Sequence, residues 1–162
     1  MATDSPSRPK AARFDSPEQE AFLNLWRTYD RLRAFEDELF RAFDLTPQQY
    51  NVLRLLQAAR PEPVPTLALA DRLVSRAPDI TRMLDKLEQA GLVARERPPE
   101  NRRQVLISIT EAGTTLLDAI AGPLRECHAR QLGHLPKSDL KRLTALLRAA
   151  REPHEPPGSC WL

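Results

Sequence analysis

Apolar residues repeat at helical spacing along most of this 162-residue chain, and the exception is confined to residues 92–109. There, segments 92–97 and 104–109 alternate apolar and polar residues as strands do, and a polar, proline-containing segment joins them. The preceding segment, from about residue 78 to 90, has helical spacing and stops at Gly91, as expected for a glycine just after a helix end. A helix that leads directly into a short two-stranded ribbon leaves few folds open to the chain.

Further helices are predicted on both sides of this segment. Residues 16–19 (SPEQ) and 46–49 (TPQQ) both fit a capping box with proline at the first helical position, so helices should begin near residues 17 and 47. The first should reach Leu45. A stiff extended link at 61–65 and a short helix from Thr66 should follow, and two longer helices should begin near residues 110 and 136.

This order of elements is typical of a winged helix-turn-helix. The expected fold is therefore mainly α with a small β-wing, with the winged helix-turn-helix at 46–110, a disordered N-terminal tail at 1–15 and a flexible C-terminal tail at 152–162. The helices at 16–45 and 111–151 carry more apolar surface than one small core covers, and a second copy of the chain would bury it. We therefore expect a helical dimerisation region there, formed by the N- and C-terminal helices; an ordinary monomeric helical core is the alternative.

Composition excludes several classes of protein. With 24 Lys and Arg against 22 Asp and Glu, the net charge of +2 excludes a polyanion-coating tail and leaves nucleic-acid binding open. No apolar run is long enough to span a membrane and no secretory core is present, so a cytoplasmic protein is expected. The chain also lacks the common hydrolase, zinc-protease and phosphate-loop motifs and has no paired cysteines. We expect no enzyme activity, cofactor or metal site.

The helix between residues 78 and 90 has two distinct faces. Ile80, Met83, Leu84 and Leu87 fall within about 100° of arc and predict a core-facing stripe. The opposite side carries arginine, glutamine and threonine, which can bond base edges or phosphates in a major groove. Asp85 also lies there, either as a partner that orients Arg82 or as an acceptor for a cytosine amino group. A solvated helix surface with incidental ion pairs is the alternative for this whole face.

The ribbon that follows has an arginine-rich tip, and such a wing can reach phosphates or place a guanidinium in a minor groove. Together, this helix and ribbon give a predicted set of DNA-binding residues: Arg76, Pro78, Thr81, Arg82, Lys86, Gln89, Arg95, Arg97, Arg102 and Arg103.

Residues 79–93 (DITRMLDKLEQAGLV), 101–103 (NRR) and 109–113 (ITEAG) resemble the MarR family of bacterial winged-helix transcriptional regulators. The resemblance implies a homodimer that binds a pseudo-palindromic operator on double-stranded DNA, commonly as a repressor relieved by a small phenolic or lipophilic effector, an oxidant or a metal. By position it implies that Arg103 enters the minor groove beside Arg102, and that Thr81 and Arg82 read bases. The family usually has aspartate where Asn101 stands, so Glu100 would have to orient Arg103.

Several assignments keep two interpretations. Trp26, Arg27 and Tyr29 can line a ligand pocket, although core packing explains their spacing equally well. Cys127 is either a small core residue or a sensor thiol, and Cys160 in the tail can oxidise. The small net charge also fits a winged-helix protein-interaction module that does not bind DNA.

Overall fold

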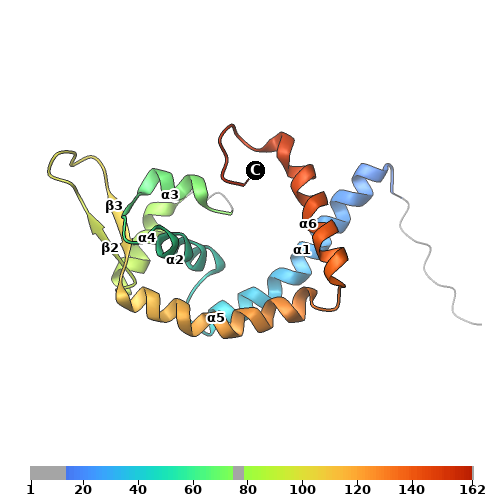
Figure 1. The fold of residues 1–162 in the computed structure, drawn as a ribbon, viewed down its shortest axis with the longest axis horizontal. Coiled ribbons are helices and arrows are strands. Elements are labelled where there is room, and N and C mark those ends of the chain that lie inside the picture. Colours follow the sequence, from blue (N-terminus) through green and yellow to red (C-terminus); the bar gives the residue numbers. More distant parts are fainter. Residues whose placement is uncertain (1–13, 75–78, 162) are drawn as a thin grey trace, which may run out of the picture. The chain divides into compact units, whose positions relative to one another are not determined.

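The computed structural model describes residues 14–74 and 79–161 (Figure 1). It consists of two compact units, residues up to Ala34 and residues from Phe35 onward. The elements run in the order α1 (Pro17–Arg41), α2 (Pro47–Ala59), β1 (Val64–Pro65), α3 (Thr66–Arg72), α4 (Ile80–Gln89), β2 (Val93–Glu96), β3 (Leu106–Ile109), α5 (Glu111–Leu132), α6 (Lys137–Arg151) and a short 3-10 helix, η1 (Glu152–His154). This order confirms the prediction of a mainly helical chain with a small β-wing.

Local capping explains where the first two helices begin. At α2, the Thr46 hydroxyl accepts from the Gln49 amide at 3.2 Å, and the Gln49 side chain accepts from the Thr46 amide at 2.8 Å, which completes the predicted capping box. At α1, Ser16 accepts from the Gln19 amide at 3.1 Å, but the Gln19 side chain accepts from the amide of Asp15. Helices α1 and α2 thus begin at Pro17 and Pro47, as their capping signals predict.

The end of α1 differs from the prediction. The helix stops at Arg41 rather than at Leu45, and Asp44 adopts a positive φ of 54°. The Leu45 amide then donates to the Phe40 carbonyl at 3.0 Å, so the chain turns and buries both side chains. The apolar spacing continues to Leu45 because Phe43 and Leu45 still pack on the core after the helix has ended.

The sheet has three strands in the order β1-β3-β2, all antiparallel. Strands β2 and β3 are the predicted hairpin, with Val93 opposite Ile109. The expected extended link at 61–65 contributes a third strand, in which Val64 lies opposite Ile107. Pro65 can occupy this place because β1 is an edge strand, where a missing backbone donor costs little.

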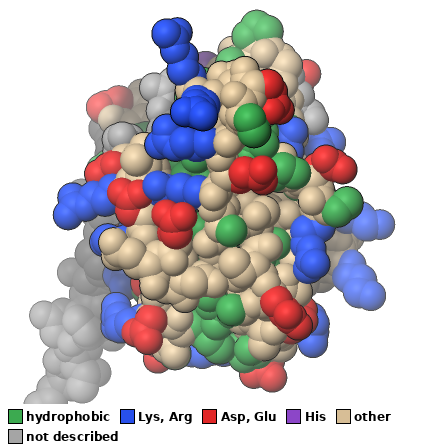
Figure 2. Space-filling view, turned by 90° about the vertical axis from the view of Figure 1, so that its left-hand side faces the viewer, with side chains coloured by type: hydrophobic (Ala, Val, Ile, Leu, Met, Phe, Trp, Pro, Cys, Tyr) green, Lys and Arg blue, Asp and Glu red, His purple; other side chains and the backbone are tan. Residues whose placement is uncertain are grey.

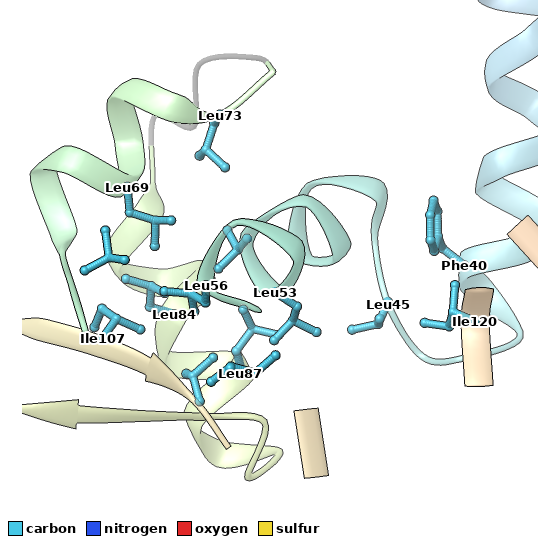
Figure 3. Close-up of a cluster of buried hydrophobic side chains, with 14 of the residues drawn as sticks. Phe40, Leu45, Leu53, Leu56, Leu69, Leu73, Leu84, Leu87, Ile107 and Ile120 are labelled. Atoms are coloured by element: carbon cyan, nitrogen blue, oxygen red, sulfur yellow. The ribbon is translucent and has the colours of Figure 1, made fainter. Parts of the chain in front are cut away.

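The core lies where α2, α3, α4 and the sheet meet. Figure 3 shows Leu53, Leu56, Leu69, Leu84 and Leu87 converging from three helices, and each of these side chains is at most 2% exposed. Burying a leucine side chain contributes about 1.5–3 kcal/mol. This cluster therefore fixes α4 against α2 and the sheet and determines which side of α4 faces outward.

The C-terminal part of the chain is helical through α5 and α6, and α5 continues past Pro123. Residues 152–161, for which the sequence predicts flexibility, have specific contacts with the end of α6. Arg151 pairs with Glu155 at 3.0 Å and donates to the Trp161 carbonyl at 2.8 Å, while Ser159 donates to Glu155 at 2.7 Å. No helix within residues 14–74 and 79–161 is long and apolar enough to cross a membrane.

Candidate nucleic-acid interface

Both ends of α4 are fixed by local hydrogen bonds. Asp79 is the N-cap, and its carboxylate accepts from the Arg82 amide at 3.1 Å. At the other end, Gly91 has a φ of 71°, its amide donates to the Glu88 carbonyl at 2.8 Å, and the Leu92 amide donates to the Leu87 carbonyl at 2.9 Å. This pair of bonds is a Schellman motif, which confirms the predicted role of Gly91.

The two faces of α4 are those that its sequence spacing predicts. Leu84 and Leu87 are each 1% exposed, and Ile80 and Met83 pack partly buried against the same core. The outward face presents four exposed side chains of the predicted set, Thr81, Arg82, Lys86 and Gln89. They lie on the side of α4 opposite its buried stripe, so the exposed face of the helix carries two cations and two neutral hydrogen-bonding groups.

Asp85 does not have the partner that helical spacing suggested. Its carboxylate forms an ion pair with Arg95 on β2, at 2.6 Å from a guanidinium nitrogen. The prediction that Asp85 orients Arg82 is therefore wrong. Arg95 is ten positions from Asp85 in the sequence, and strand β2 places it alongside the helix. Helical periodicity predicts contacts only within one helix, so it does not predict this pair.

The β2–β3 loop forms the wing. Amide-to-carbonyl bonds of Asn101 with Pro98 at 3.1 Å, and of Gln104 with Asn101 at 3.0 Å, fold it into successive turns. The side chains of Arg97, Arg102 and Arg103 are all exposed. Arg97 also donates to the Arg102 carbonyl at 3.5 Å, which ties the two sides of the loop together. In the described part of the chain no ion pair joins Glu100 to Arg103. Glu100 therefore does not take over the role of the aspartate that Asn101 replaces.

A groove of about 770 Å³ separates the wing from α3 and α4. Its lining includes Thr66, Thr81, Arg95, Arg97 and Arg103. A second hollow, of about 390 Å³, lies between the start of α2 and α4 and includes Arg82 and Lys86. Figure 2 shows the side of the molecule that carries the wing, with basic and acidic side chains next to one another rather than in one large basic patch.

The remaining predicted residues do not gather at this surface. Arg76 and Pro78 lie outside the described residues. Trp26 and Tyr29 are 63% and 60% exposed on the N-terminal part of α1, where Arg27 is exposed as well. The rings of Trp26 and Phe22 contact each other in a tilted arrangement, with centroids 6.2 Å apart. The helical spacing of these residues thus places them on an open apolar surface of α1 rather than in a core.

The two cysteines differ in environment. Cys127 is buried and belongs to the apolar side of α5, whereas Cys160 is exposed. Burial raises the pKa of the Cys127 thiol, and the nearby Glu36 carboxylate adds to this while Arg130 opposes it. His128 lies 3.3 Å from Glu36. Within residues 14–74 and 79–161 no cluster of His, Cys, Asp and Glu has the arrangement of a metal site.

Comparison with known proteins adds independent information. The family model described as "MarR family" matches residues 45–105, which span α2 through the wing. A MarR transcription factor from Planctomyces limnophilus is 54% identical, with 85% of this chain and 99% of that chain covered and a TM-score of 0.68. The homoprotocatechuate degradative operon repressor of Escherichia coli is 28% identical, covering 67% of this chain and 72% of that protein. A mutant Escherichia coli MarR solved with operator DNA is 22% identical, with 81% and 93% covered and a TM-score of 0.73.

Proposed function

Because this chain belongs to the MarR family of DNA-binding transcriptional regulators, we propose that it is a homodimeric repressor of a pseudo-palindromic operator, released by a small-molecule effector. The observation that carries the proposal is the position of α4 and the wing. Thr81 of α4 lines one groove with Arg97 and Arg103 of the wing, and the exposed Arg82 and Lys86 of α4 line the second hollow. This arrangement lets a helix enter the major groove while the loop follows the backbone to the adjacent minor groove.

Each side chain has a distinct task in this proposal. On α4, Thr81, Arg82 and Gln89 read base edges, since threonine, arginine and glutamine match the donor and acceptor pattern of the major groove. Lys86 and Arg97 bind phosphates. At the wing tip, Arg103 enters the minor groove and Arg102 binds the neighbouring phosphate. Arg76 and Pro78, outside the described residues, also belong to the predicted contact set, but the proposal does not depend on them.

The proposed dimer is supported by apolar side chains that remain in water in the single chain. Phe22, Trp26 and Tyr29 on α1 are each at least 60% exposed, and Leu146 on α6 is 60% exposed. A soluble monomer rarely leaves so many large apolar groups open. We therefore assign residues 16–45 and 111–151 to dimerisation and residues 46–110 to DNA binding. Two-fold symmetry then places two copies of α4 one helical turn of DNA apart.

Repression is supported by the name of one relative. A similar protein is named as the repressor of a degradative operon for homoprotocatechuate, a phenolic acid. By analogy we propose that a small phenolic or lipophilic compound binds near Trp26, Arg27 and Tyr29, whose aromatic rings and guanidinium suit such a ligand. Because the protein acts on chromosomal DNA, we propose that it works in the cytoplasm.

A mobility-shift titration tests the proposal. The full chain is mixed with the promoter fragment next to its own gene and with an equal-length fragment from within a coding region, at about 50 and 200 mM salt. We expect preference for the promoter fragment at both concentrations and a large loss of affinity at the higher one, since phosphate contacts release counterions. Equal affinity for the two fragments would contradict sequence-specific repression.

A further inference from the structure

Arg95 belongs to the predicted DNA-contact set, but its guanidinium is already occupied within the protein. From β2 it reaches three groups of α4: the Asp85 carboxylate at 2.6 Å, the Glu88 carboxylate at 3.5 Å and the Thr81 carbonyl at 3.2 Å. Its side chain is 22% exposed, whereas the side chains of Asp85 and Glu88 are 46% and 44% exposed. The arginine is thus the more enclosed member of each pair.

The three contacts follow one side of the helix. Thr81, Asp85 and Glu88 stand four and three positions apart, which is the spacing of neighbours on one helical face. A single guanidinium therefore holds about two turns of α4 against the strand that leads into the wing. Among the described residues Nε of Arg95 has no hydrogen-bond partner and meets Glu88 only as an ion pair, so the Asp85 pair and the hydrogen bond to the Thr81 carbonyl give the contact its fixed geometry. This contact also sets the separation between α4 and the strand that leads into the wing.

The charge of α4 gives the contact a second role. Within Ile80–Gln89, the two cations Arg82 and Lys86 are balanced by the two carboxylates Asp85 and Glu88. The N-cap Asp79 adds a third carboxylate, so the helix with its cap has one excess negative charge, which Arg95 offsets. Without it, two unpaired carboxylates on a helix that approaches phosphates would repel the DNA.

We propose that Arg95 is a positioning residue that never touches DNA: it neutralises Asp85 and Glu88 and fixes α4 relative to the wing. This inference rests on the DNA-binding role of the chain, and it separates Arg95 from Arg97, Arg102 and Arg103. Those three arginines are exposed and supply the contacts with the backbone and the minor groove.

The test compares the salt dependence of DNA binding in three proteins: Arg95→Gln, a neutral triple variant that adds Asp85→Asn and Glu88→Gln, and Arg103→Gln as the reference for a lost DNA contact. Arg95→Gln should weaken binding to every duplex by about tenfold or more. The triple variant should recover to within a fewfold of the natural chain and keep at least its slope of log affinity against log salt. Arg103→Gln should lower the magnitude of that slope by about 1.

The contrary results are equally specific. If the triple variant stays as weak as Arg95→Gln and its slope is lower by about 1, Arg95 is a phosphate ligand and the inference is wrong. An Arg95→Gln protein that binds like the natural chain also overturns it. If Arg95→Gln does not fold, Arg95→Lys replaces it. That variant keeps the charge without the fork and should lose affinity only in part, with an unchanged slope. Failure of the natural chain to bind any duplex would instead refute the DNA-binding function.

Discussion

The hydroxyl of Thr110 donates a hydrogen bond to the carbonyl of Gly91 at 2.7 Å. The same oxygen accepts from the Gly113 amide at 3.1 Å and so caps α5. One side chain thus joins the C-terminal end of α4 to the N-terminal end of α5. It is a direct physical link between the helix that we assign to DNA and a helix that we assign to the dimer.

This link predicts the effect of substituting Thr110. Thr110→Val keeps the shape but loses both bonds, and it should lower the free energy of unfolding by about 1–2 kcal/mol. Thr110→Ser keeps the hydroxyl and serves as the matched control, with a loss well below that of valine. Urea unfolding followed by circular dichroism measures both. Equal stability of the valine and serine variants would show that the hydroxyl contributes nothing.

Gly113 predicts a steric limit at the same junction. A Cβ added there would collide with the Leu92 carbonyl oxygen and approach an Ile109 side-chain carbon to 2.7 Å. Gly113→Ala should therefore destabilise the fold by about 1–3 kcal/mol, as overpacking does. Gly122→Ala is the comparison in the same helix: beyond its chain neighbours its Cβ would meet no atom within 4 Å, so its expected cost is limited to the contact with the Pro123 ring and should be smaller than that of Gly113→Ala. Thermal unfolding of the two variants side by side decides the matter.

The wing predicts a specific salt effect. Arg103→Ala should weaken binding to the operator and lower the magnitude of the log-affinity against log-salt slope by about 1, since one contact with the DNA is lost. Lys137→Ala removes the same charge from an exposed position at the start of α6 and should leave the slope unchanged. Fluorescence anisotropy at several salt concentrations gives both slopes. Matching slopes for the two variants would remove Arg103 from the interface.

The cysteines should react at very different rates. Because burial holds the pKa of the Cys127 thiol above its ordinary value, its thiolate is scarce at neutral pH and its alkylation should stay slow until the pH passes well above about 8.5. Exposed Cys160 should be alkylated first. Mass spectrometry after brief iodoacetamide treatment at pH 7 measures the extent of alkylation at Cys160 relative to Cys127. Faster labelling of Cys127 would favour the sensor-thiol interpretation.

Local sequence signals predicted much of this fold, because each depends on neighbours along the chain. The capping box at Thr46 and the C-terminal glycine at Gly91 involve residues at most five positions apart. The buried stripe with Leu84 and Leu87 follows from helical periodicity alone. These features fixed the order of elements and the outward face of α4 without any tertiary information.

Features that depend on long-range contacts escaped prediction. Strand β1 has only two residues, and its pairing with β3 spans more than 40 positions, so no periodic pattern marks it. The Arg95 contacts cross from a strand to a helix, and the sequence alone suggested a free wing arginine. In both cases the fold, and not sequence spacing, brings the partner close. The tail-like composition of residues 152–161 gave no sign of the contact between Arg151 and Trp161, ten positions away, whereas Glu155 lies only four positions from Arg151.

Hydroxyl-radical footprinting of the promoter fragment tests the central claim most directly, since it maps where two symmetric copies of α4 and the wing would lie. The account predicts two protected patches centred about 10–10.5 base pairs apart and related by the two-fold axis of a pseudo-palindrome, with minor-groove protection on either side. A single patch without symmetry, or protection that does not depend on sequence, would contradict it.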